Sequence, residues 1–187
     1  MSTRLLLTVA EYGRIGEAGG FDSLGRRIEL IDGEIHEMSP VGPIHSDFID
    51  YLSSWSIRVA EPAGMRVRIQ SDIVLSDSTQ PVPDVTWMNG RRYLDRLPLP
   101  SDVRLIIEVA DSSLSFDLGT KADRYADAGV AELWVVDVTH RCLHAMSDPL
   151  GGTYTQRRRF EPPQQPAPLC LPTAKLDLAD LFDEPEA

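Results

Sequence analysis

The sequence predicts an α/β (α+β) fold in which helices flank a central sheet. The segments 104–110 and 132–138 are both apolar enough to be buried strands, and a helix is predicted between them. A strand, a helix and a second strand in that order favour parallel pairing of the two strands. Another helix, over 44–59, repeats apolar residues at helical spacing, and its apolar face needs a sheet to pack on.

The N-terminal region is predicted to form a helix and a β-hairpin. Thr8 and Glu11 match a capping box, so a helix is expected over 8–18. The dipeptide Asp32-Gly33 is the strongest short-range signal for a hairpin turn. The two strands expected on either side of this turn are 27–31 and 34–38.

The middle of the chain carries further strand signals and one more helix. Residues 65–75 place apolar side chains on one face and polar ones on the other, as in a half-buried strand. The helix that follows residue 110 is expected to be capped by Ser115 and to end at Gly129, with Tyr125 in its apolar stripe. The strands expected here are 65–75, 84–88, 104–110 and 132–138.

The C-terminal part is predicted to contain an edge strand over 153–160, followed by an irregular tail. Five prolines within 161–172 predict an extended segment, so 161–187 is expected to be a Pro-rich linker and a C-terminal tail. One closing helical turn is expected over 176–182. We expect a single domain over 1–187, because a chain of 187 residues that is 42% hydrophobic can bury one substantial core.

The composition limits the compartment and the partners. No charged leader precedes an apolar segment, and no segment approaches the roughly 18 apolar residues that span a bilayer, so a cytoplasmic protein is expected. Cys142 and Cys170 lack partner cysteines at metal-ligand spacing, which excludes a disulfide framework and a zinc finger. The net charge of −11 counts against a generic nucleic-acid binder, so DNA would have to meet a local basic patch. The candidate patches are Arg66 with Arg68, Arg91-Arg92 with Arg96, and Arg157-Arg158-Arg159.

Asp84 and Glu108 are the most informative residues for predicting the function. Glu108 interrupts an apolar strand and Asp84 opens another apolar segment. Burying an unpaired carboxylate costs several kcal/mol or forces protonation, so each residue needs a cation, hydrogen bonds or solvent. Two strand carboxylates held close together favour a divalent cation, Mg²⁺ or Mn²⁺, and the backbone carbonyl of Val109 is a further candidate ligand.

Lys121 is predicted to complete this site. On a helix that begins near Phe116, Lys121 falls about 70° from the centre of the apolar stripe. Its stem can therefore run along the sheet and bring the ammonium toward Glu108, where it would orient a water and neutralise charge on a phosphoryl group. The alternative is an ordinary surface ion pair with Asp117, four residues earlier.

Three further residues are weaker candidates for the site. Glu29 could supply an additional carboxylate, although a cross-strand pair with His36 explains it nearly as well. His45, near the start of the helix over 44–59, could contact a phosphate or the site, although a lone histidine is usually structural. Asp137 is expected to end its strand with a turn instead of binding metal.

Several motifs together resemble one bacterial family. They are Arg27-Ile28-Glu29-Leu30-Ile31-Asp32-Gly33-Glu34, Met38-Ser39-Pro40, Pro83-Asp84, Ile107-Glu108-Val109, the Lys121/Tyr125 pair, residues 129–137 (GVAELWVVD) and residues 176–182 (LDLADLF). In their order and spacing the chain resembles, over nearly its whole length, the Uma-two family of restriction-endonuclease-like proteins.

The resemblance implies a core of the PD-(D/E)XK nuclease type, a mixed sheet flanked by helices, with Asp84, Glu108 and Lys121 as the metal-binding and water-activating residues. In the general nuclease motif a lysine stands two positions after the acidic residue, where this chain has Ala110. The family's pattern allows the lysine to lie on the helix instead. A second departure is the loop at 111–113, which reads Asp-Ser-Ser where the family often has Ser-Pro-Ser.

The leading functional hypothesis is a Mg²⁺-dependent endonuclease that hydrolyses phosphodiester bonds in DNA. Two alternatives stay open. The acidic composition favours a non-catalytic interaction module on a nuclease-like scaffold. A metal-dependent hydrolase of a smaller phosphate ester would keep the same site with a different substrate. A homodimer is expected by analogy with nucleases that cut both strands.

Overall fold

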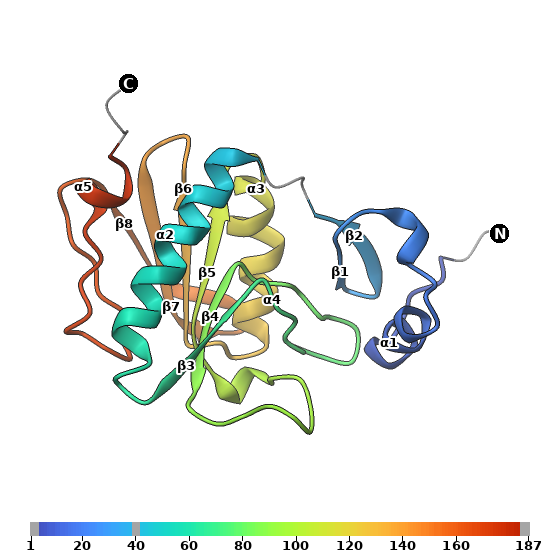
Figure 1. Ribbon diagram of the computed structural model, residues 1–187. Helices are drawn as coiled ribbons and strands as arrows, with labels where there is room; N and C mark the ends of the chain where they lie inside the picture. The colour runs from blue at the N-terminus through green and yellow to red at the C-terminus, as the bar shows by residue number, and fades with distance from the viewer. Residues whose placement is uncertain (1–3, 39–41, 184–187) are drawn as a thin grey trace.

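The computed structural model describes residues 4–38 and 42–183. Within them, a mixed sheet of six strands forms the body of the protein, in the order β3-β4-β5-β6-β7-β8 (Figure 1). β5 and β6 are parallel, as predicted, and the other neighbours are antiparallel. The strands are β3 (Met65–Ile69), β4 (Val85–Asn89), β5 (Val103–Ala110), β6 (Glu132–Asp137), β7 (Cys142–Leu150) and β8 (Thr153–Phe160).

Helices cover both faces of this sheet (Figure 1). On one face α2 (Pro43–Ala60) packs its apolar stripe on the strands, and Trp55 contacts the buried rings of Trp87 and Trp134. The other face is covered by consecutive helical segments that share a core with β5 and β6. These segments are α3 (Leu114–Phe116), the π-helical turn η3 (Asp117–Lys121) and α4 (Ala122–Asp127).

The alternation of side chains along β5 decides where Glu108 points. Ile107 and Val109 belong to the core beneath α2, whereas Ile106 and Ala110 belong to the core beneath α4. Successive side chains of a strand point to opposite faces. Glu108 therefore faces the helical segment that carries η3 and α4.

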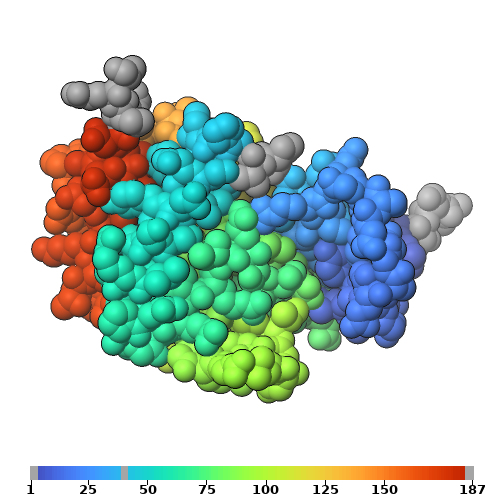
Figure 2. All heavy atoms as spheres, in the orientation of Figure 1, coloured from blue at the N-terminus to red at the C-terminus, as the bar shows by residue number. Residues whose placement is uncertain are grey.

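An N-terminal arm, residues 4–38, lies beside the body and is drawn in blue in Figures 1 and 2. The capping box of Thr8 and Glu11 is present at the start of α1. Asp32 and Gly33 both have positive φ, 53° and 79°, as the predicted two-residue turn requires. The arm contains α1 (Val9–Glu17), the short 3₁₀ helix η1 (Asp22–Leu24), β1 (Ile28–Ile31) and β2 (Glu34–Glu37).

One sequence prediction about the strands was wrong, and one strand was missed. The strand predicted over 65–75 ends at Ile69, because Gln70 has a positive φ of 44° and its N–H donates to the carbonyl of Asp84. Ile73 consequently lies in the core beneath α4, whereas Met65 packs against the core beneath α2. The long strand β7 was not predicted at all.

The predicted start of the helix over the α4 face was also wrong. The helical segment begins at Leu114, so Ser115 lies inside it, and no side chain caps its N-terminus. A 3₁₀ helix, η2 (Pro100–Asp102), precedes β5.

The chain after β8 returns across the sheet and packs beside α2 (Figure 1). The predicted closing turn is confirmed as α5 (Leu178–Leu181), whose first turn is capped by the side chain of Asp177. Leu176 and Phe182 on either side of α5 are buried in the core beneath α2. Among the described residues, no helix combines the length and the apolar character needed to cross a membrane.

Candidate active site

A cluster of buried charges lies where the N-terminal arm, the sheet and the turn η3 meet. Four carboxylates surround one ammonium, and each of the five side chains belongs to a residue at most 5% exposed. Three of the carboxylates and the ammonium were predicted site residues, and Asp117 was predicted only as a possible partner of the lysine. The five residues are Glu29, Asp84, Glu108, Asp117 and Lys121.

Lys121 is the centre of this cluster. Its Nζ lies 2.8 Å from Glu108 Oε1, 3.4 Å from Glu29 Oε2 and 3.9 Å from Asp117 Oδ1. The interpretation of Lys121 and Asp117 as a surface ion pair was wrong, because both residues are buried and Glu108 is the nearer partner. The prediction that the lysine reaches over the sheet to Glu108 is confirmed in its geometry.

Asp84 stands immediately before β4 and is tied to the neighbouring strand β5. Its Oδ2 accepts a hydrogen bond of 2.9 Å from the N–H of Val109, the residue after Glu108. Its Oδ1 lies 3.4 Å from His45 Nε2, in the first turn of α2, and accepts a bond of 3.3 Å from the Gln70 amide. Of the two predicted metal-binding carboxylates, Asp84 is therefore held just before β4 and Glu108 within the adjacent strand β5.

Glu29 brings the N-terminal arm into the site. Its Oε2 accepts a hydrogen bond of 3.2 Å from the N–H of Val82 and also faces the Lys121 ammonium at 3.4 Å. The predicted cross-strand pairing of Glu29 with His36 is present in the backbone register. The carboxylate nevertheless turns toward the body, so the pairing alone does not explain why an acidic residue stands here.

Tyr125 was missed as a member of the site, because its position in the apolar stripe accounted for it. Its hydroxyl donates a hydrogen bond of 2.6 Å to Glu108 Oε1. Ser113 was missed as well, and its hydroxyl donates to Asp117. The usable signal was the spacing of four residues between Ser113, Asp117, Lys121 and Tyr125, which places such positions on one side of a helix.

The two predicted metal-binding carboxyls have opposite electrostatic environments. Burial raises the pKa of Asp84, but hydrogen bonds from His45 and from the Val109 N–H outweigh burial and leave its pKa below the ordinary value. The bond to Asp84 in turn raises the pKa of His45, and burial opposes that shift. Asp84 is therefore held as a carboxylate, next to an imidazole that is biased toward its protonated form.

The buried carboxyl of Glu108 holds a proton more tightly than an ordinary glutamate does. Burial raises its pKa to about 8, and although Lys121 opposes this, the negative charges of Asp84, Asp117 and Glu29 add to it. Burial lowers the pKa of Lys121, but the surrounding carboxylates outweigh burial and raise it above the ordinary value. The lysine thus stays protonated, and a proton on Glu108 relieves the remaining repulsion.

The residues present fit a divalent cation. A cavity of about 90 Å³ is lined by the four carboxylates together with Arg27, His45 and Ser113. Since about 10–15 Å³ of water-accessible space holds one water, this cavity has room for an ion together with several waters. Carboxylate oxygens are the ligands that Mg²⁺ and Mn²⁺ prefer, and a cation would offset the excess of buried negative charge.

Comparison with known proteins identifies the family. The family model Uma2, described as "Putative restriction endonuclease", matches residues 10–179. The chain belongs to the Uma2 family. This confirms the resemblance predicted from the sequence, and the Uma2 match includes all five buried charged residues of the site.

The Uma2 chain also has the fold of a solved structure. That structure is described as the crystal structure of "a putative nuclease belonging to DUF820" from Anabaena variabilis ATCC 29413. The two are 17% identical with a TM-score of 0.72, and the match covers 94% of this chain and 97% of the other. At this identity the similarity shows the fold alone. A search of curated proteins finds no match.

Proposed function

We propose that this Uma2 protein is a Mg²⁺-dependent endonuclease that hydrolyses phosphodiester bonds in DNA. The observation that carries the proposal is a set of four buried carboxylates on one cavity with a single buried ammonium, which lies 3.9 Å or less from three of them. A purely structural ion pair needs one carboxylate for one ammonium. Burying the additional carboxylates costs free energy unless a cation offsets their charge. The family's description as restriction endonucleases suggests that such a cation would serve phosphodiester hydrolysis.

Asp84 and Glu108, with the backbone carbonyl of Val109, are the residues that would hold the cation. Hydrogen bonds already fix both side chains, since Val109 and His45 orient Asp84, and Tyr125 orients Glu108. When bound, Mg²⁺ would supply Lewis-acid stabilisation of charge on the phosphoryl oxygens and lower the pKa of a water.

Lys121 would act on the attacking water and on the developing negative charge. Its ammonium is held at the cavity by Glu108 and Glu29, and it remains protonated because carboxylates surround it. A protonated lysine can donate hydrogen bonds to a water and to a phosphoryl oxygen. Glu29 would position Lys121, and His45 would place a second cationic group beside the cavity.

DNA would approach through a local basic patch on an otherwise acidic protein. Arg157, Arg158 and Arg159 are exposed on β8, whose axis lies three strand spacings, about 14 Å, from that of β5. Arg91 and Arg96 are weaker candidates, because both guanidinium groups already face Asp102. Cutting both strands would further call for a two-fold homodimer, which light scattering can test.

The decisive experiment is plasmid cleavage by the Glu108→Gln variant. Cleavage that requires Mg²⁺ in the wild type should fall by at least about 100-fold in this variant, because an amide cannot replace the charged ligand. The matched control is Glu132→Gln, a buried glutamate on β6 whose partners are Trp134 and the Leu169 N–H. Equal cleavage by Glu108→Gln and the wild type would reject the proposal.

A second candidate is hydrolysis of a smaller phosphate ester at the same site. The net charge of −11 favours it, because an acidic protein repels a polyanion more strongly than a small ester. Activity on a chromogenic phosphodiester with none on DNA or RNA would select this candidate. Failure to bind Mn²⁺ in calorimetry would favour the non-catalytic interaction module instead.

A further inference from the structure

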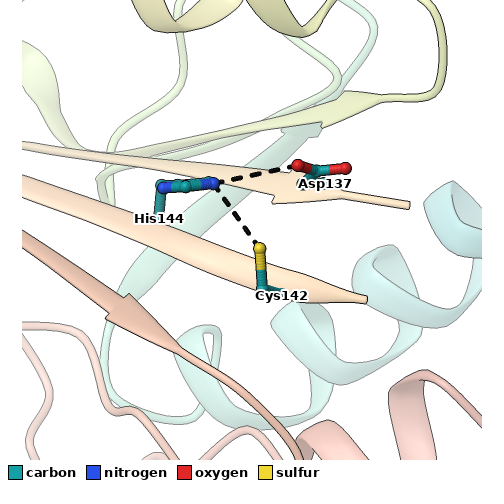
Figure 3. Close-up of side chains that lie close together, drawn as sticks. All are labelled: Asp137, Cys142 and His144. Carbon is teal, nitrogen blue, oxygen red and sulfur yellow. Dashed lines mark hydrogen bonds and ion pairs between the residues drawn. The ribbon is translucent and has the colours of Figure 1, made fainter. Parts of the chain in front are cut away.

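A second group of potential metal ligands lies at the hairpin between β6 and β7. Asp137 is the last residue of β6, and Cys142 and His144 are the first and third residues of β7. Figure 3 shows the three side chains pointing toward one another. His144 Nε2 lies 3.5 Å from Cys142 Sγ and 3.9 Å from Asp137 Oδ2.

The strand register explains why these side chains converge. Asp137 pairs with Cys142 across the antiparallel ladder, so their side chains leave the same face of the sheet. His144 is two residues after Cys142 and therefore also points to that face. The hairpin thus places a carboxylate, a thiol and an imidazole together on regular strands, where their positions are well defined.

The spacing and the chemistry fit Zn²⁺. In a tetrahedral site with Zn–S of about 2.3 Å and Zn–N of about 2.0–2.1 Å, the sulfur and nitrogen atoms are about 3.5 Å apart. The separation of Cys142 Sγ and His144 Nε2 is 3.5 Å. His144 Nε2 and Asp137 Oδ2 are 3.9 Å apart, and the ligand atoms of all three residues lie within 4.8 Å of one another, so Asp137 has to move closer when the ion binds. A thiolate and an imidazole favour Zn²⁺ over Mg²⁺ or Mn²⁺.

We propose that Asp137, Cys142 and His144 form a zinc-binding site, separate from the carboxylate cluster, with water as the fourth ligand. Asp137 ends its strand with a turn, as predicted, and the proposal adds a metal-binding role that the sequence analysis did not expect. It does not depend on the proposed nuclease activity, because none of its three residues belongs to that site.

The burial of the ligands supports the proposal. Cys142 and Asp137 are almost fully buried, whereas the His144 side chain is 25% exposed, so an ion can enter from the His144 side. Asp137 Oδ1 is fixed by the N–H of His140, which leaves Oδ2 as the ligand atom. His140 Nδ1 now lies 2.8 Å from Oδ2, but its side chain is 62% exposed and can turn into solvent when the ion binds.

The competing interpretation is an ordinary hairpin end in which Asp137 accepts hydrogen bonds and the buried Cys142 thiol faces the guanidinium of Arg159. The two interpretations differ in the state of the sulfur. Zinc binding requires a thiolate and releases a proton, whereas a buried inert thiol stays protonated.

Cobalt spectroscopy of the full chain tests the proposal. The Cys170→Ser variant removes the exposed cysteine and leaves Cys142 as the sole thiol. We expect Co²⁺ to give this variant the sulfur-to-cobalt charge-transfer band and tetrahedral visible bands, and Zn²⁺ to abolish both at one equivalent. Mg²⁺ in excess should not abolish them. Absence of the charge-transfer band in the Cys170→Ser variant would overturn the proposal, and no fold-disrupting change is needed for that result.

Variants of the proposed ligands should lose zinc binding or the charge-transfer band. In the Cys170→Ser background, His144→Gln should weaken zinc binding by at least about 10-fold, and Cys142→Ser should remove the charge-transfer band. The folding of each variant is checked by circular dichroism. Zinc affinity unchanged by His144→Gln in a folded protein would also reject the proposal. Loss of plasmid cleavage is not a readout here, so the two proposals can fail independently.

Discussion

The hydroxyl of Tyr125 donates a 2.6 Å hydrogen bond to Glu108 Oε1, the same oxygen that faces the Lys121 ammonium. A hydrogen bond to the charged form of a carboxyl favours that form. Tyr125→Phe should therefore raise the pKa of Glu108 further and move the pH midpoint of Mn²⁺ binding upward. It should also lower the free energy of unfolding by about 1–3 kcal/mol.

Tyr154→Phe is the matched control for this change. Tyr154 is also buried, and its hydroxyl donates a 2.9 Å bond to the carbonyl of Val130. It should lose similar stability in thermal unfolding without changing the pH midpoint of Mn²⁺ binding in calorimetry. The same midpoint in Tyr125→Phe and the wild type would contradict the role given to Tyr125.

Metal affinity should depend steeply on pH because a proton and a cation compete for Glu108. The pKa of Glu108 is raised to about 8, mainly by burial. Below that pH the cation must displace a proton, so Mn²⁺ affinity should fall about tenfold for each pH unit between 8 and 6 and level off above 8. Calorimetry at several pH values, in buffers of different ionisation enthalpy, measures both the affinity and the proton released. A constant affinity from pH 6 to 9 is incompatible with this assignment.

Glu108→Gln should stabilise the metal-free protein near neutral pH. The folded state holds the Glu108 proton more tightly than the unfolded state, in which the pKa is near its ordinary value of 4.5. The resulting stability is fully present below about pH 4.5 and is lost as the pH rises toward about 8. Glutamine does not ionise, so the variant should be more stable than the wild type at pH 7, by about 1–3 kcal/mol.

Urea unfolding of the wild type and Glu108→Gln at several pH values checks this stability difference. The advantage of the variant should grow between about pH 4.5 and pH 8 and then stay constant. The buried control outside the site is Asp102→Asn, because the pKa of Asp102 is lowered and its stability difference from the wild type should stay constant between about pH 4.5 and pH 8. An advantage that shrinks with rising pH would show that Glu108 is held as a carboxylate in the metal-free protein.

Lys121→Met should lower stability and abolish cleavage but preserve metal binding. The change removes the one lysine of the cluster and leaves its carboxylates unpaired, so metal-free stability should fall by about 3–5 kcal/mol. A bound cation can replace the lost charge, so saturating Mn²⁺ should raise the melting temperature more in the variant than in the wild type. Cleavage should nevertheless stay lost, because the group proposed to orient the attacking water is absent.

Lys175→Met controls for the loss of a lysine, since Lys175 is exposed. It should change neither stability nor cleavage measurably. If Mn²⁺ stabilised Lys121→Met no more than the wild type, the cation and the ammonium would not share the same carboxylates.

The fold was predictable where local patterns agree with the tertiary structure. Asp32-Gly33 fixed the hairpin, and the apolar segments around Glu108 and Trp134 were long enough to be recognised as parallel strands. The strand β7 was not predicted because its sequence includes His144, Asp148 and Pro149 and therefore lacks a continuous apolar or alternating pattern. Its pairing with β6 comes from the tertiary structure and not from local propensity.

Four of the five charged members of the site were predictable, whereas Asp117 and the neutral members were not. A buried carboxylate such as Glu108 stands out in an apolar strand, whereas Tyr125 is compatible with a helix stripe whether or not its hydroxyl has a partner. The convergence of Asp137 with Cys142 and His144 depends on the register of an unrecognised hairpin. Such contacts require the relative placement of elements, which spacing along one element does not supply.

The π-helical turn η3 makes the site depend on the length of its helix as well as on its composition. The N–H of Ala122 bonds to the carbonyl of Asp117, five residues earlier, so this turn holds one residue more than an α-helical turn. Loss of one residue within η3 can be absorbed by a return to α-helical geometry, which keeps the residues on either side in register. In-frame loss of a single codon just after it, such as that of Ala122 in α4, would instead rotate the flanking residues by about 100° relative to each other. Tyr125 would then turn away from Glu108, although every acidic residue and the lysine would survive in the gene. Inactive homologues would therefore arise by a change of spacing that leaves all the recognisable motifs intact.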